Sequence, residues 1–172
     1  MNRIIRWTSD LPNRVPEQTK QTDYFLCLVV GAIFAAHLAV ALSHGGPVAV
    51  PDIPAYVGYG QWFGGQSPVL PEAQYHPGFG MLLTPLVWLG LDGSELHSAA
   101  LIMNGILAAF LVGLTNKYAQ MLGVSPGVRR LIIILVCVYP GVSSASRVAL
   151  PETLLSVIVM LTAVLVEKRS PS

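Results

Sequence analysis

The stretch YFLCLVVGAIFAAHLAVALSHGGPVAVP, Tyr24–Pro51, contains no Asp, Glu, Lys or Arg. A helix needs roughly 20 mostly apolar residues to cross a bilayer. Three further charge-free stretches follow, at Leu96–Asn116, Leu131–Ser146 and Thr153–Val166. Only 11% of the 172 residues are charged and 53% are hydrophobic, whereas an ordinary soluble domain has about 25% charged residues. The sequence therefore predicts an all-α integral membrane protein with about four transmembrane helices.

We expect these helices at about 24–42, 97–116, 131–149 and 152–167, the last on the short side. Two other interpretations stay open. Buried helices of a soluble core are disfavoured, because four such stretches occur in a short chain. The first stretch also resembles a signal peptide, with Ala39-Val40-Ala41 as the cleavage site. Against this, 23 residues precede it, and it is longer than the usual core of about 7–15 residues.

The basic residues predict the orientation. With these four spans, only Arg147 falls on one side of the membrane, and nine basic residues fall on the other: Arg3, Arg6, Arg14, Lys20, Lys117, Arg129, Arg130, Lys168 and Arg169. Basic residues near span ends favour the cytoplasm. We therefore expect a multi-pass protein of the plasma membrane with cytoplasmic tails at 1–23 and 169–172, and a membrane domain at 24–168. The first tail, with its two prolines, is expected to be flexible or to lie on the surface.

The segment 43–96 is then an extracytoplasmic loop without Lys or Arg. It contains an apolar stretch, Phe79–Leu91, that is too short to span comfortably. Counting it as a span would also move the downstream basic residues outside. We therefore expect an interfacial or re-entrant helix over 78–91, on the outer face. Ser94 is the expected N-cap of the following helix, with Glu95 in its first turn.

Asp52 is the first candidate site residue. It opens a helix-like segment in which Asp52, Tyr56 and Phe63 fall near one face at helical spacing. One interpretation makes Asp52 a helix N-cap, followed by Pro54 in the first turn. The other makes it a general base at the membrane surface. Both stay open.

Two further groups face the same outer side in this topology. Tyr75-His76-Pro77-Gly78 immediately precedes the short apolar helix, whose free N–H groups and His76 could bind an anion such as a lipid phosphate. His76 could equally be a simple interfacial residue. Arg147 and Glu152 are the only charged residues in the outer connection between the last two spans, and they are either functional or a local ion pair. His37, inside the first span, is interpreted as a helix-packing residue.

Several classes of partner and cofactor lack a sequence signal. No basic patch predicts nucleic-acid binding. Cys27 and Cys137 lie inside apolar stretches, so we expect buried thiols without a disulfide. No cluster has metal-ligand spacing, and no cofactor is evident, although a requirement for a divalent metal stays open.

The order of these motifs resembles the N-terminal part of the GT-C membrane glycosyltransferases, in particular the bacterial protein mannosyltransferases and aminoarabinose transferases. The resemblance covers roughly residues 24–168. The segments that carry it are Pro51-Asp52-Ile53-Pro54-Ala55-Tyr56, Tyr75-His76-Pro77-Gly78-Phe79-Gly80-Met81-Leu82-Leu83 and Leu150-Pro151-Glu152-Thr153-Leu154-Leu155. It implies transfer of a sugar from a polyprenyl-phosphate donor on the outer face. It also implies that Asp52 is the catalytic base, with His76 near the donor phosphate and Glu152 as a second acid. Tyr56, Tyr75 and Arg147 complete the expected substrate-binding set.

The chain departs from this family in two respects. Many relatives have paired acids in the first loop, where Ile53 follows Asp52 here. Relatives also have more spans and often a soluble domain. The resemblance therefore implies a fragment, a truncated or inactive product, or one half of a split enzyme that a C-terminal partner chain completes. The alternative is a non-catalytic multi-span subunit, scaffold or transporter fragment, insensitive to changes at Asp52, His76 and Glu152.

Overall fold

The computed structural model describes residues 16–43, 52–71, 77–139 and 151–169, with the backbone alone for 16–23, 52 and 53. Within these ranges it contains only α-helices and no strand, which confirms the all-α class. The helices are α1 (Pro16–Ser43), α2 (Asp52–Phe63), α3 (Gly78–Trp88), α4 (Gly93–Met121), α5 (Pro126–Val138) and α7 (Glu152–Arg169).

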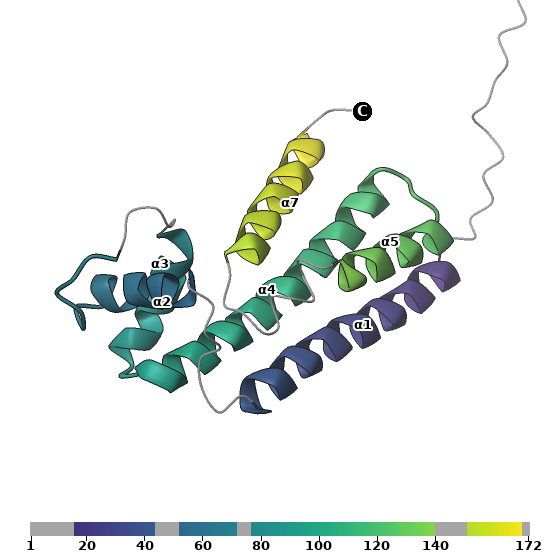
Figure 1. Ribbon diagram of the computed structural model, residues 1–172. Helices are drawn as coiled ribbons and strands as arrows, with labels where there is room; N and C mark the ends of the chain where they lie inside the picture. Colours follow the sequence, from purple (N-terminus) through teal and green to yellow (C-terminus); the bar gives the residue numbers. More distant parts are fainter. Residues whose placement is uncertain (1–15, 44–51, 72–76, 140–150, 170–172) are drawn as a thin grey trace, which may run out of the picture.

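The long helix α4 is the centre of the structure (Figure 1). It contacts α1, α5 and α7 along its length, and the short pair α2–α3 lies beside its first turns. The fully buried side chains of α4 include Leu96, Leu101, Asn104 and Val112. In Figure 1, α1 and α5 run opposite to α4, and α7 runs with it. The N-termini of α1 and α5 therefore lie at the same end of the bundle as the C-termini of α4 and α7.

Two of the described helices are long and apolar enough to cross a membrane, Tyr24–Ser43 within α1 and Gly93–Met121, which is α4. They contain the predicted spans at 24–42 and 97–116. The predicted span at 152–167 lies within α7, an 18-residue helix with charged residues at both ends. The predicted span at 131–149 begins in α5, whose helix ends at Val138, and residues 140–149 lie outside the described ranges. These two spans stay predictions.

Three helix ends differ from the sequence predictions. Helix α1 begins at Pro16, so the expected tail at 1–23 overlaps the helix by its last eight residues. The short apolar helix expected over 78–91 is present as α3 but ends at Trp88, and Gly90 turns the chain with a φ of 90°. The N-cap of α4 is Asp92 and not Ser94, because Gly93, with a φ of 42°, places Ser94 inside the helix. Glu95 is in the first turn, as expected.

Candidate functional site

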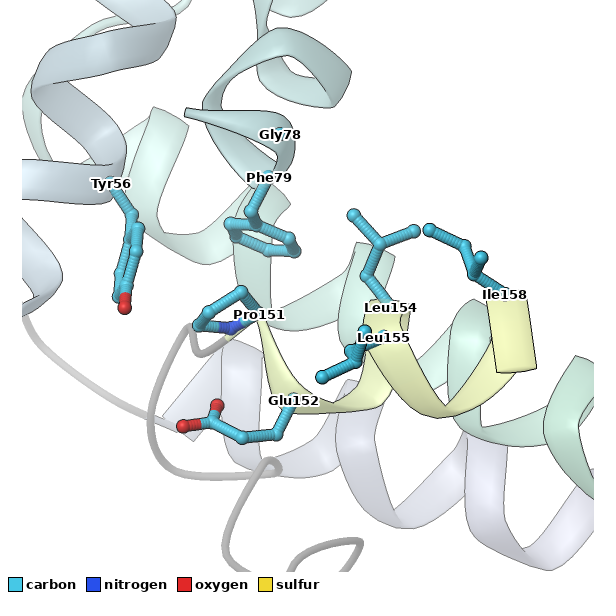
Figure 2. Close-up of a pocket in the computed structure, with 8 residues that line it drawn as sticks. All are labelled: Tyr56, Gly78, Phe79, Pro151, Glu152, Leu154, Leu155 and Ile158. Atoms are coloured by element: carbon cyan, nitrogen blue, oxygen red, sulfur yellow. The ribbon is translucent and has the colours of Figure 1, made fainter. Parts of the chain in front are cut away.

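A cavity of about 330 Å³ brings three distant parts of the chain together (Figure 2). Helix α2 contributes Tyr56, and the start of α3 contributes Gly78 and Phe79. The remaining wall comes from Pro151 and the first two turns of α7, from Glu152 to Ile158. These are the segments that carry the resemblance described above. A single site therefore collects residues from all three motifs.

Close packing of α2 against α3 fixes the first half of the cavity. A Cβ atom added at Gly80 would lie 2.9 Å from the backbone nitrogen of Gly60 and 3.0 Å from the carbonyl oxygen of Tyr56. At Gly64, an added Cβ would lie 2.8 Å from the Cβ of Val87. Such distances leave no room for a side chain, so glycine allows the two backbones to approach closely.

The glycine contacts place Tyr56 against Phe79. Both side chains are buried, and their rings meet edge to face with centroids 6.4 Å apart at an angle of 83°. This geometry is favourable for aromatic pairs because the positive ring edge meets the negative ring face. The pair forms a rigid wall, so the position of the Tyr56 side chain in the cavity is set by the packing of α2 on α3.

The second half of the cavity is the N-terminus of α7. Glu152 is the first residue of this helix and is exposed, and the N–H of Leu155 donates a hydrogen bond to the carbonyl oxygen of Pro151 at 3.0 Å. A carboxylate is favourable in this position because the helix N-terminus has a partial positive charge. In Figure 2 the Tyr56 hydroxyl and the Glu152 carboxylate lie toward one side of the site, and Leu154 and Ile158 line the other. The cavity thus has a polar side and an apolar side.

The structure brings together two of the six predicted site residues, Tyr56 and Glu152. Asp52 is the first residue of α2, one helical turn before Tyr56, and its side chain is outside the description. Tyr75, His76 and Arg147 are outside the described residues. The prediction that these four join Tyr56 and Glu152 at one site stays a prediction.

Two contributors to the cavity were not identified as site residues from the sequence. Phe79 was quoted within the Tyr75–Leu83 motif and as the start of the apolar helix, but it was given no role in the site, although it is fully buried against Tyr56. The glycines that hold α2 on α3 were also missed. The signal was present as Gly60-Gln61-Trp62-Phe63-Gly64, because two small residues four positions apart lie on one helix face and permit close helix packing.

The described residues of the cavity offer few charged groups that could bind a ligand or a metal ion. Glu152 is its only charged side chain among the described residues. The described part of the chain contains no group of three or more His, Cys, Asp or Glu side chains that could hold a metal ion. The described acids and hydroxyls therefore offer proton transfer and hydrogen bonding as their chemistry.

His37 has a structural position consistent with helix packing. It is 3% exposed, and its ring Nδ1 lies 3.0 Å from the carbonyl oxygen of Ile33, one turn earlier in α1. A Cβ added at Gly105 of α4 would lie 2.7 Å from the His37 Cβ. The two helices therefore cross closely at this point.

Comparison of the chain with protein-family models, with curated proteins and with solved structures gave no match.

Proposed function

We propose that this chain is a multi-span membrane protein that acts as a GT-C-type glycosyltransferase, or as its N-terminal part. In this proposal it transfers a sugar from a polyprenyl-phosphate donor to an acceptor on the extracytoplasmic face. The observation that supports it best is the cavity itself. Three motifs that are separated by up to about a hundred residues in sequence contribute Tyr56, Phe79 and Glu152 to one site.

The proposed reaction assigns a role to each acid. Asp52 removes the proton from the acceptor hydroxyl as its oxygen forms a bond to the anomeric carbon of the sugar. The bond between that carbon and the phosphate oxygen breaks, and polyprenyl phosphate leaves with the bonding electrons. Tyr56, one turn from Asp52, and Glu152 hold the substrates by hydrogen bonds. His76 and Arg147 are proposed to contact the donor phosphate, and Tyr75 the sugar.

A membrane location is supported by the surface of the bundle. Large apolar side chains are exposed along the helices, among them Leu28 on α1, Leu135 on α5 and Val159 on α7. A soluble monomer rarely exposes extended apolar surface. The described basic residues Lys117, Arg129, Arg130, Lys168 and Arg169 all lie near helix ends that share one end of the bundle. We propose that this end is cytoplasmic, with both termini, and that the bilayer surrounds four spans.

The experiment is a transfer assay in membranes that contain the chain in its native setting, together with any C-terminal partner chain. Loss of a general base lowers a rate by about 10²–10⁴-fold, so Asp52→Asn is expected to lower polyprenyl-phosphate-dependent sugar transfer by that factor. Asp92→Asn is the matched control, since Asp92 is an N-cap of α4 outside the cavity and Asn caps equally well. Equal rates in the two variants would refute the assignment of Asp52 as the base.

The second candidate function is a non-catalytic membrane subunit or scaffold. The close approach of α1 to α4 at Gly105 favours it, because a scaffold depends on helix packing alone. It predicts that assembly fails when Gly105 or Gly80 is enlarged, and that Asp52→Asn and Glu152→Gln have no effect.

A further inference from the structure

Two arginines lie near the beginning of α5, at the end of a helix that favours acidic residues. A helix N-terminus has free N–H groups and a partial positive charge, so an acid is stabilising there and a base is not. Helices α4 and α7 follow this rule, with Glu95 and Glu152 in their first turns. Helix α5 has no acid in its first turn, and its fourth and fifth residues are Arg129 and Arg130. Positive charge therefore accumulates at this helix end.

The guanidinium group of Arg129 is almost buried. Its side chain is 6% exposed, and its Nε is fully buried without a hydrogen-bond partner. The terminal nitrogens Nη1 and Nη2, unlike Nε, are not fully buried, so the end of the fork is accessible. Long side chains in helices point back toward the helix N-terminus, which directs this fork over the first turn of α5. A buried charge without a partner is strongly unfavourable, and an anion at this turn would supply the partner.

Two further features add to the positive potential of this turn. The N-cap residue Ser125 makes no side-chain hydrogen bond to the free N–H groups of α5. The Cζ of Arg130 lies 5.8 Å from the centroid of the Phe25 ring, a contact that holds the guanidinium without neutralising it. Arg130 is about 100° around the helix from Arg129, so it contributes charge and not a second fork. Free N–H groups beside an arginine fork are the groups with which proteins bind phosphate.

The surface that continues from this turn indicates a lipid as the source of the phosphate. Val128, Leu131 and Leu135 follow one another along one face of α5, at helical spacing. Their exposed fractions are 50%, 55% and 57%. A soluble phosphate makes no use of an apolar surface, whereas acyl chains bury it. A phospholipid with its phosphate at the first turn of α5 would place its chains against these three side chains.

We propose that the first turn of α5 binds the phosphate group of an anionic phospholipid, with Arg129 as the principal donor. The acyl chains lie against Val128, Leu131 and Leu135. The inference rests on the membrane location proposed above, and it places a specific lipid at the end of the bundle opposite to the Tyr56–Glu152 cavity. Lipid binding does not require sugar transfer. It is measured without any sugar donor, so its failure leaves the glycosyltransferase proposal unaffected.

The test is native mass spectrometry of the full chain in detergent, titrated with phosphatidylglycerol or with phosphatidylcholine of the same acyl chains. Both lipids have a phosphodiester, but the trimethylammonium group of phosphatidylcholine opposes the positive charge of the site. A charge-assisted hydrogen bond corresponds to about a tenfold difference in affinity or more, so we expect phosphatidylglycerol to bind about tenfold more tightly. Inorganic phosphate is the third probe, and we expect it not to displace the lipid.

Variants separate binding from folding. Arg129→Met removes the charge and keeps the length of the side chain, so we expect the preference for phosphatidylglycerol to disappear. In the absence of lipid the Tm is expected to be unchanged or raised, because a buried charge without a partner is lost. Arg129→Lys is expected to restore only part of the preference, since an ammonium lacks the planar fork. Lys117→Met is the matched control, because Lys117 is an exposed base near the C-terminal end of α4.

Three results would overturn the proposal. The first is equal binding of the two lipids by the wild type, and the second is displacement of phosphatidylglycerol by inorganic phosphate. The third is a loss of preference in Lys117→Met as large as that in Arg129→Met. A lower Tm of lipid-free Arg129→Met would also contradict it, because that result indicates a partner for Arg129 within the chain.

Discussion

The helices α1 and α4 both pass the length and composition test for a membrane span, yet they differ in what surrounds them. Half of the apolar window of α4 is buried inside the bundle, whereas only 11% of the corresponding window of α1 is buried. The more apolar of the two, α1, is the more exposed one. Helix α4 has several buried polar side chains, including Thr115 and Asn116, whereas His37 is the buried polar side chain among the described residues of α1. Hydropathy thus indicates which helices can face lipid, and it does not show which helix forms the core.

The largest expected change in the free energy of unfolding comes from shortening a side chain at the centre of the bundle. Leu101 of α4 is fully buried, whereas Leu28 of α1 is 73% exposed. Leu101→Ala leaves a cavity and is expected to lower the free energy of unfolding by about 2–5 kcal/mol. Leu28→Ala removes surface contacts alone and is expected to change it by less than about 0.5 kcal/mol. Unfolding of both variants in detergent, followed by circular dichroism, measures the difference. Similar losses would show that α1 is buried in a larger assembly.

At two glycines of α4, substitution by alanine is expected to change the free energy of unfolding in different directions. Gly105 packs against His37 of α1, whereas Gly113 has nothing within 4 Å of an added Cβ. Gly105→Ala is expected to push the helices apart and to cost about 1–3 kcal/mol. Gly113→Ala is expected to be neutral or to stabilise by up to about 1 kcal/mol, since Ala is the better helix former. The same unfolding measurement applies, and a neutral Gly105→Ala would argue against the close crossing of α1 and α4.

The smallest expected change in stability concerns a side-chain contact between α1 and α5. The Arg130 guanidinium carbon lies 5.8 Å from the centroid of the Phe25 ring. A cation over an aromatic face contributes about 0.5–1 kcal/mol at an exposed site. Arg130→Gln is therefore expected to destabilise the protein by about that amount, and Arg130→Lys by less. If Phe25→Leu makes the Arg130→Gln effect vanish in a double-mutant cycle, the contact is verified; additive effects would reject it.

Much of the fold follows from the sequence because the signals are local. Long charge-free stretches predicted α1 and α4, and the short apolar stretch Phe79–Leu91 predicted α3. Helix ends were less predictable, since Gly93 adopts a positive φ and moves the cap of α4 to Asp92. For the site, Tyr56 and Glu152 were identified from motifs, but their meeting depends on contacts between helices distant in sequence. The spacing of Gly60 and Gly64 is visible in the sequence, but the identity of the helix that packs against them is not, because it depends on which helices become neighbours.

The central claim is that α2 and the N-terminus of α7 meet at one site. The direct measurement uses a variant with Cys27 and Cys137 replaced by Ala and with cysteines at positions 56 and 152, treated with a short bifunctional thiol reagent in membranes. The account predicts a cross-linked peptide joining α2 to α7. A control with cysteines at 152 and 168 is expected to give none, because these positions lie at opposite ends of α7, about 24 Å apart along the helix. Cross-linking in the control alone, or in neither protein, would contradict the account.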